Sequence, residues 1–401
     1  MSNKVPKIRF NGYSEAWVQR NLSEVATITG GSTPSTSNPE YWDGDINWFA
    51  PAEIGNQTYV TESSKKISEL GLQKSSAKIL PVGTILFTSR AGIGKTAILA
   101  SEASTNQGFQ SIVPGDTLDS YFVYSLTDKL ARYGNKMGSG STFDEISGKQ
   151  LGKYPITMPE IEEQVKIGNL FKNLDNLIAA NQRKLDLLKE QKKGYLQKMF
   201  PKNGAKVPEL RFAGFADDWE ERKFGELYKK VNEKNDLSFG KDKVISVANM
   251  YFKDTGNIRS DDAYMKTYNI FRMGDIAFEG NRSKHFSYGR FVENTIGDGI
   301  VSHVFDVFRP IQQFDLNYWK YAIHNERVMG PILMTATTSS TMMTNLVAKD
   351  FLKRAILVPS YSEQKLVGSF FKQLDDTIAL HQRKLDLLRE QKKGLLQKMY
   401  V

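Results

Sequence analysis

Two short segments contain residue types that nucleotide-binding and methyl-transferring enzymes use. Ser89 to Thr96 follows an apolar run and ends in Gly-Lys-Thr, but Ser89 stands where the phosphate-binding pattern G-x-x-x-x-G-K-[ST] needs its first glycine. Asn38 to Tyr41 is similar to the Asn/Asp-Pro-Pro-Tyr/Phe motif of amino-methyltransferases, with Glu40 in place of the second proline and no glycine-rich cofactor loop before it. The sequence therefore favours neither nucleotide hydrolysis nor methyl transfer by this chain, and we interpret the second segment as a turn.

The other chemistry-bearing residues form no catalytic or metal-binding pattern. The chain has no cysteine, which excludes disulfides and thiolate chemistry and fits a reducing cytoplasm. The four histidines lack metal-ligand spacing, the N-terminus does not resemble a signal peptide, and no apolar run is long enough to span a bilayer. We therefore expect a cytoplasmic, non-catalytic protein that binds no cofactor and no metal of its own.

The net charge of +9 is the first indication of a partner. A basic surplus of this size is typical of proteins that bind polyanions, most often nucleic acid, although ordinary basic proteins also have it. The 401 residues, 40% of them hydrophobic, are enough for two or three domains with their own cores.

The sequence contains an internal duplication, which is the strongest signal in it. Residues 181–200 and 381–400 differ at only four of 20 positions. Residues 5–10 also resemble residues 207–212, and both continue through a glycine and a tryptophan, Trp17 and Trp219. The offsets of 200 and 202 residues indicate two tandem halves that share a duplicated framework.

The segments between the duplicated ones differ. Residues 30–155 and 232–355, here called the two inserts, have similar length and little identity, and each contains a strand-like run before a basic loop, at 84–90 and 275–282. One framework with two different inserts suits a protein that recognises two different targets.

The duplicated segments have the period of long helices. Leu174, Ile178, Leu185 and Leu188 belong to a stripe with alternating steps of four and three residues, and the second copy repeats it. We predict a helix from about 160 to 199 and its counterpart 200 residues later, beginning at the capping boxes Thr157-x-x-Glu160 and Ser360-x-x-Glu363. Helices this long with one apolar stripe need a partner, so we expect the two to pair antiparallel.

Polar residues and glycines interrupt the two helices. Asn181, His381, Lys192 and Lys392 lie on the apolar stripe, either at its solvent edge or as residues that fix register and direction. Gly194 and Gly394 would each weaken a helix, and a close crossing of the helices would explain both.

Together these features resemble the specificity subunits of type I restriction-modification systems. The resemblance covers essentially the whole chain and is carried by the twin QRKLDLL-x-EQKKG-x-LQKM helices, the VP-x-RF-x-G-x-x-x-x-W segments, and TSRAGIGKTAI with the following TNQGFQSI. It implies that each insert is a target-recognition domain reading one half of a split, asymmetric DNA site in the major groove. The helices would set the unread gap between the halves.

The resemblance also implies the partners. They are double-stranded DNA, two adenine-N6 methyltransferase subunits docked on the helices and, in a complete system, two restriction or translocase subunits; no membrane is involved. S-adenosylmethionine would be bound by the methyltransferase, and ATP and Mg²⁺ by the restriction subunit.

The fold class that we expect is α+β. Two mixed globular target-recognition domains related by pseudo-two-fold symmetry would be joined by two long antiparallel coiled-coil helices. The first domain, with its N-terminal framework segment, would span 1–156, the first spacer helix 157–201, the second domain 202–357 and the second helix 358–401. The N-terminal segment and the C-terminal helix are expected to meet, which makes the arrangement pseudo-cyclic.

Polar and basic loop residues of the inserts are the candidates for DNA contact, because base edges and phosphates are bound by such side chains on preformed loops. Arg90, Lys95, Arg282 and Lys284 are the strongest candidates. The full set is Ser32, Thr33, Ser89, Arg90, Lys95, Gln107, Gln110, Ser141, Asn281, Arg282, Lys284, His285, His303, Thr338 and Thr341.

Two other classes of protein remain as alternatives. One is an enzyme, against which Ser89 and Glu40 argue, and which binding of ATP or S-adenosylmethionine by the chain would revive. The other is a coiled-coil scaffold without a DNA role. Salt dependence separates that scaffold from a DNA-binding protein, because phosphate contacts make affinity fall steeply with salt.

Overall fold

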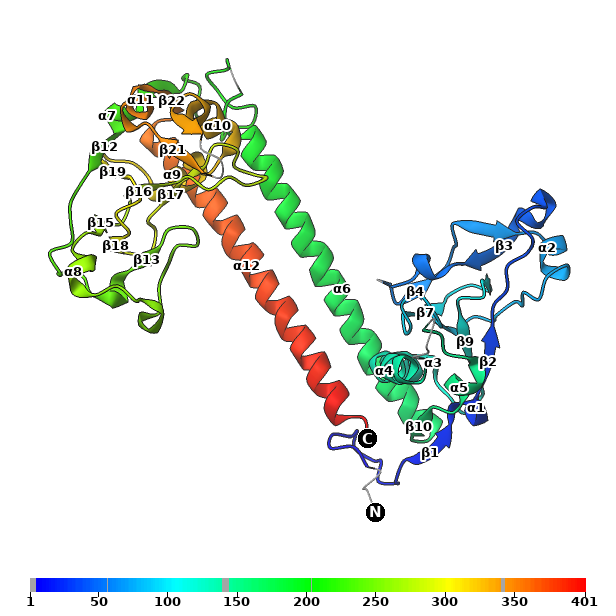
Figure 1. The fold of residues 1–401 in the computed structure, drawn as a ribbon. Helices are drawn as coiled ribbons and strands as arrows, with labels where there is room; N and C mark the ends of the chain where they lie inside the picture. Colours follow the sequence, from blue (N-terminus) through cyan, green and yellow to red (C-terminus); the bar gives the residue numbers. More distant parts are fainter. Residues whose placement is uncertain (1–4, 56, 139–143, 203, 340–342) are drawn as a thin grey trace. The chain divides into compact units, whose positions relative to one another are not determined.

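The computed structural model describes residues 5–55, 57–138, 144–202, 204–339 and 343–401. It divides into two compact units, one made of Met1–Gln182 with Lys384–Val401 and the other of Arg183–Arg383. Each unit therefore contains one insert, the first part of the long helix that follows this insert, and the last part of the other long helix (Figure 1).

The first unit is built around a five-stranded sheet in the order β2-β9-β6-β7-β4, with every pair antiparallel except β4 and β7. A three-stranded sheet, β5-β3-β8, lies in the same insert, and β1 pairs with β10 where the chain enters and leaves it. The elements before the first long helix are β1 (Val18–Asn21), α1 (Leu22–Val25), β2 (Ala26–Gly30), η1 (Pro39–Tyr41), β3 (Trp42–Phe49), η2 (Pro51–Glu53), β4 (Tyr59–Val60), β5 (Lys65–Ile67), α2 (Glu69–Gln73), β6 (Ile85–Phe87), β7 (Thr96–Leu99), β8 (Ser104–Thr105), β9 (Gln110–Pro114), α3 (Ser120–Ser125), α4 (Thr127–Gly138), α5 (Gly148–Gly152) and β10 (Pro155–Met158).

The second unit has a different sheet within the same framework. Its largest sheet is four-stranded and antiparallel, in the order β12-β19-β16-β17, and β11 pairs with β22 as β1 pairs with β10. The elements between the long helices are β11 (Glu220–Lys223), α7 (Phe224–Leu227), β12 (Tyr228–Val231), η3 (Lys241–Lys243), β13 (Ile245–Ser246), β14 (Tyr251–Phe252), η4 (Thr255–Asn257), α8 (Asp262–Met265), β15 (Asn269–Phe271), β16 (Ile276–Glu279), β17 (Arg290–Glu293), β18 (Gly299–Val301), β19 (Val307–Pro310), α9 (Leu316–Ile323), α10 (Glu326–Met334), β20 (Thr337–Ser339), β21 (Thr344–Leu346), α11 (Ala348–Lys353) and β22 (Ala355–Val358).

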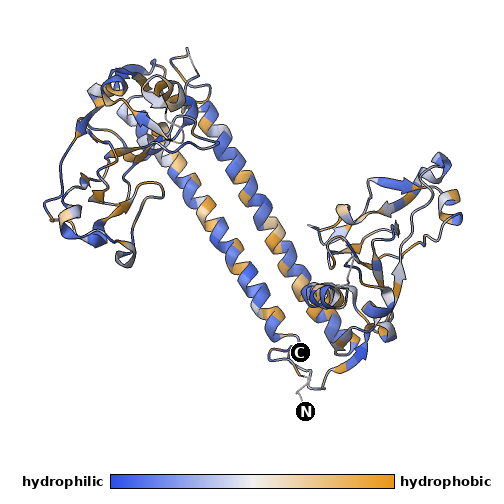
Figure 2. Ribbon diagram, in the orientation of Figure 1, coloured by the Kyte–Doolittle hydropathy of each residue, from blue (hydrophilic) through white to orange (hydrophobic). Residues whose placement is uncertain are grey.

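The long helices are α6 (Ile161–Lys198) and α12 (Tyr361–Lys398), as the periodicity predicts. Each has 38 residues, and hydrophilic and hydrophobic residues alternate along both of them (Figure 2). In the first unit Phe171 of α6 stacks on Tyr400, and Asp175, one turn later, pairs with Lys392. Residue numbers increase along α6 in the direction in which they decrease along α12, so the two helices run antiparallel within this unit.

The second unit repeats this packing at positions 200 residues away. Phe371 stacks on Phe200, and Asp375 pairs with Lys192 at 2.6 Å. The lysines on the stripe therefore form ion pairs between the helices, which supports the role of fixing register and direction. Asn181 instead donates to the Leu177 carbonyl of its own helix, 2.8 Å away.

An aromatic core in each unit joins the framework segments. In the first unit Trp17 and Phe171 contact Tyr400, which lies just beyond the end of α12. The second unit has Trp219 and Phe371 against Phe200. In both units, duplicated aromatic residues thus pack around the aromatic residue that follows the end of a long helix.

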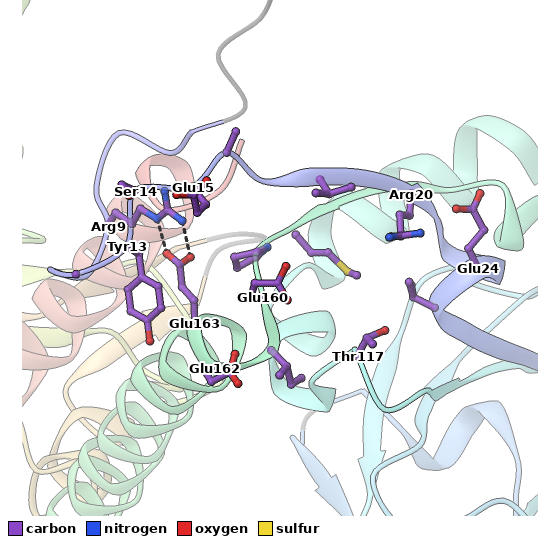
Figure 3. Close-up of a pocket in the computed structure, with 17 residues that line it drawn as sticks. Arg9, Tyr13, Ser14, Glu15, Arg20, Glu24, Thr117, Glu160, Glu162 and Glu163 are labelled. Atoms are coloured by element: carbon purple, nitrogen blue, oxygen red, sulfur yellow. Dashed lines mark hydrogen bonds and ion pairs between the residues drawn. The ribbon is translucent and has the colours of Figure 1, made fainter.

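The N-terminal framework segment is attached to the long helices by one repeated ion pair. Arg9 donates from Nε and Nη2 to the two carboxylate oxygens of Glu163, at 2.7 and 2.8 Å, as the dashed lines in Figure 3 show. The Ile8 amide also donates to the Lys398 carbonyl at the end of α12, which confirms that the N-terminal segment and the C-terminal helix meet. Arg211 and Glu363 form the same bidentate pair in the second unit.

Two expectations about helix ends and glycines need correction. Ser360 precedes α12 and its hydroxyl accepts the Glu363 amide, as a cap should, but Thr157 lies in strand β10, which ends before α6 begins at Ile161. Apart from its own helix backbone, a β-carbon built on Gly194 or Gly394 meets no described atom within 4 Å, so the predicted close crossing at these glycines is wrong.

Alanine at Gly194 and Gly394 should therefore stabilise the protein. We expect each substitution to raise the free energy of unfolding by up to about 1 kcal/mol, because alanine loses less backbone entropy in a helix interior. Urea unfolding measures this. Gly168→Ala and Gly368→Ala are the contrast, since their new β-carbons would lie 2.5 and 2.4 Å from the carboxylates of Asp119 and Asp315. Destabilisation by G194A would contradict this account.

Candidate nucleic-acid interface

The phosphate-loop-like segment of the first unit is a hairpin connection. Strand β6 is followed by the loop of Ser89 to Lys95 and then by the antiparallel strand β7, whereas a phosphate-binding loop leads into a helix. Asn38 accepts the Glu40 amide through its side chain and caps the short helix η1, which agrees with the predicted turn.

The loop between β6 and β7 is held in one conformation. The Thr88 hydroxyl donates to the Gly92 carbonyl and accepts the Lys95 amide, at 2.7 and 2.9 Å. Gly94 has φ +98°, and a β-carbon there would lie 2.4 Å from that of Ala131 in α4. Arg90 is half-buried at the start of this loop and Lys95 is exposed at its end, so both basic side chains stand on a preformed support.

Other predicted contact residues of the first insert gather beside this loop. The Ser89 amide donates to the Gly108 carbonyl at 2.8 Å, which joins the loop to the segment carrying Gln107 and Gln110. Thr33 is hydrogen-bonded to Gln107, and the Ser32 amide donates to the Thr105 carbonyl. Loops far apart in sequence therefore lie next to one another.

Ser89 itself does not belong to that surface. Its side chain is fully buried, and its backbone is bonded to Gly108 and Ile146. A direct contact from the Ser89 hydroxyl to DNA is thus not available in this conformation, and the residue supports the loop instead. Ser141 lies outside the described residues.

In the second insert the loop after β16 corresponds to the loop between β6 and β7 of the first insert. Asn281, Arg282, Lys284 and His285 are all exposed on it. The loop is anchored by the Thr344 amide, which donates to the Gly280 carbonyl at 2.8 Å. Thr344 begins β21, and β21 pairs with β20, so the hairpin that carries exposed Thr338 adjoins the loop. Thr341 lies outside the described residues.

His303 is not brought to this cluster. It follows β18, its ring lies 5.9 Å from that of Tyr264, and its Nδ1 is 3.4 Å from the Thr267 hydroxyl. These contacts place it on the part of the insert formed by β15, β18 and α8. Within the described residues the second candidate surface is therefore the loop after β16 with its neighbouring hairpin.

Some basic residues near these surfaces were missed by the sequence analysis. Arg132 follows Ala131, which the Gly94 loop touches, and Lys320 and Arg327 lie on α9 and α10. They stand on helices inside the inserts, whereas the sequence pointed to the loops of the inserts and, as a less favoured alternative, to the basic ends of the long helices within 181–202. Helical spacing around residues 127–138 could have revealed the first of them.

Comparison with known proteins places the chain in a family. The model of the type I restriction modification DNA specificity domain matches residues 14–190 and again residues 216–390. The chain belongs to this family. The two matches also confirm the internal duplication as two copies of one specificity domain.

Individual specificity subunits align with parts of the chain. The specificity subunit of the type I enzyme MjaIX from Methanocaldococcus jannaschii is 37% identical over 178 residues, which are 43% of this chain and 41% of the relative. That of EcoR124I/EcoR124II from Escherichia coli is 28% identical over 194 residues, 45% of this chain and 47% of the relative. The alignments thus span less than half of either relative.

Solved structures confirm the fold over nearly the whole length. A type I restriction-modification S subunit from M. genitalium matches with a TM-score of 0.59 and 15% identity, covering 99% of both chains. A structure concerned with the assembly and conformational transition of a type I system matches with a TM-score of 0.52 and 16% identity, over 96% of this chain and 97% of that one. The α+β architecture with two long helices is therefore that of specificity subunits.

Two further observations concern membrane spans and metal sites in the part of the chain that the structure describes. No helix there combines the length and the apolar character needed to cross a bilayer. No three His, Asp or Glu side chains of the described residues lie close enough together to hold a metal ion.

Proposed function

We propose that this chain recognises a split, asymmetric DNA sequence on behalf of an adenine-N6 methyltransferase and performs no chemistry itself. One observation carries the proposal: a duplicated framework presents two inserts with different sheets, and each insert offers its own polar, basic loop cluster. Two different inserts on one duplicated framework fit a DNA site whose two halves differ in sequence.

The long helices fit the role of a spacer between the half-sites. Each has 38 residues, or about 57 Å at 1.5 Å per residue, which exceeds the roughly 34–36 Å of one turn of duplex DNA. We propose that they set the unread gap and provide the docking surface for two methyltransferase subunits. Restriction subunits would join through those subunits, and S-adenosylmethionine, ATP and Mg²⁺ would be bound by the partners.

The test is co-expression with the presumed methyltransferase subunit in a host that lacks DNA methylation. Sequencing that detects N6-methyladenine should then show one split motif with two short defined halves. A stable complex that produces no methylation would contradict the proposal and favour a scaffold. Methylation without the specificity chain, measured as the control, would assign sequence recognition to the partner.

A further inference from the structure

Each unit has a groove lined by basic side chains. It lies between a pair of short helices, α3 and α4 in the first unit and α9 and α10 in the second, and the last turns of the long helix that ends in that unit. The first basic groove, about 490 Å³, lies beside α4 and the end of α12, and the second, about 630 Å³, lies beside α9, α10 and the end of α6. The basic side chains of the first groove are Lys129, Arg132, Arg389, Lys392 and Lys393. Those of the second groove are Lys189, Lys192, Lys193, Lys320 and Arg327.

Acidic side chains neutralise only part of this charge. Each groove is lined by two of them, against five basic ones. In the first, Asp175 is already bonded to Lys392 and to the Tyr121 hydroxyl. In the second, Asp375 is bonded in the same way to Lys192 and Tyr321. Both grooves therefore keep an excess of positive charge of the same size, although the inserts beside them differ.

The cations in these grooves repel one another. The pKa of Lys129 is lowered, first by burial and then by the neighbouring Arg132. In the second groove, burial lowers the pKa of His324 to about 4, and the nearby cations Arg290, Lys320 and Lys192 lower it further. A concave surface with uncompensated charge of one sign attracts the opposite charge, here an anion.

Both grooves lie near candidate DNA-contact loops, through a shared helix in the first unit and by direct contact in the second. In the first unit the loop carrying Arg90 and Lys95 packs on α4 through Gly94, and α4 also carries Lys129 and Arg132 into the groove. In the second unit His285 and Phe286, from the loop after β16, line the groove themselves. Within each unit the groove thus lies between an element that carries or supports a candidate loop and the end of a long helix.

We propose that each basic groove binds the phosphate backbone of the DNA that flanks the half-site recognised by its unit. This inference rests on the proposed function and adds that the spacer helices touch the DNA. Phosphate is the favoured anion because the grooves lie near the loops that we propose to contact DNA. Such contacts position the duplex without selecting a sequence. An acidic surface of a protein partner is the competing occupant.

The test compares two double variants with equal loss of charge. K193A/K393A removes one exposed lysine from each groove, whereas K184A/K384A removes one exposed lysine from each helix outside the grooves. Nine residues separate Lys184 from Lys193, which places them on opposite sides of a helix. The full-length chain is titrated with a random-sequence duplex and with a duplex that carries its methylated motif, at several KCl concentrations.

We expect K193A/K393A to reduce the slope of log affinity against log salt by about 0.9 per lost phosphate contact, or about two in total. Both duplexes should lose affinity by the same factor, so that the preference for the motif is kept. The K184A/K384A slope should equal that of the unaltered chain.

Equal slopes for the two double variants would overturn the inference. So would a K193A/K393A chain that binds DNA normally but loses its methyltransferase subunit in a pull-down, because the grooves would then hold a protein. Failure of the proposed function is distinguishable, since the unaltered chain would then show no preference for the motif duplex over the random one.

Discussion

Replacement of Arg9 by alanine is expected to lower the free energy of unfolding of the first unit by about 3–5 kcal/mol. The Glu163 side chain is 1% exposed and receives two charge-assisted hydrogen bonds from Arg9. Removal of the guanidinium leaves that carboxylate buried with its main partner gone, which costs far more than the loss of a surface ion pair. Urea unfolding of the full-length chain, followed by tryptophan fluorescence, measures the change.

The duplication supplies the controls for this experiment. Arg211→Ala should have the same effect on the second unit, because Glu363 is equally buried and equally bonded. The double variant R9M/E163L removes both charges and should be less destabilised than R9A alone. A loss below about 1 kcal/mol for R9A would mean that the pair behaves as an exposed ion pair and does not hold the N-terminal segment.

Exchange of the first insert for that of another specificity subunit should change one half of the methylated motif and leave the other half unchanged. The structure shows that the exchanged segment should not begin at residue 30, where the sequence alone would place its start. Strand β2 pairs with β9 over five residues, so a cut at residue 30 would leave β2 without its own sheet. Cuts after β1 and before β10, at residues 22 and 154, keep the β1–β10 ladder in the framework.

The reciprocal exchange of residues 224–354 is the matched control, because β11 and β22 form the corresponding ladder. It should change only the other half of the motif. Sequencing for N6-methyladenine gives both results. Simultaneous change of both halves in either chimera would contradict the division of labour between the inserts.

The framework was predictable from sequence because its signals are local and repeated. The apolar steps of four and three residues predicted the bounds of α6 and α12 to within about two residues, since helix periodicity depends on neighbours within one turn or two. The failure at Thr157 has a local cause as well. The residue pairs with Gln19 in the β1–β10 ladder, and a strand partner 138 positions away leaves no mark near the threonine.

The candidate sites were only partly predictable. The loops that follow β6 and β16 could be found, because a strand-like run before basic and polar residues is a local pattern. The burial of the Ser89 side chain could not be predicted, since it depends on Gly108 and Ile146, which lie far from Ser89 in the sequence. Nor could the basic grooves, which arise where α4 or α9 meets the end of a helix that begins elsewhere in the chain.

The closing of each core by the end of a long helix has a consequence for synthesis on the ribosome. Phe200 is made before the second insert, so the second unit can assemble as its own residues emerge. The first unit must wait, because Tyr400 fills its core between Trp17 and Phe171. The half that is translated first is therefore completed last, and until residue 400 emerges part of its apolar core stays exposed, which is a condition that favours aggregation.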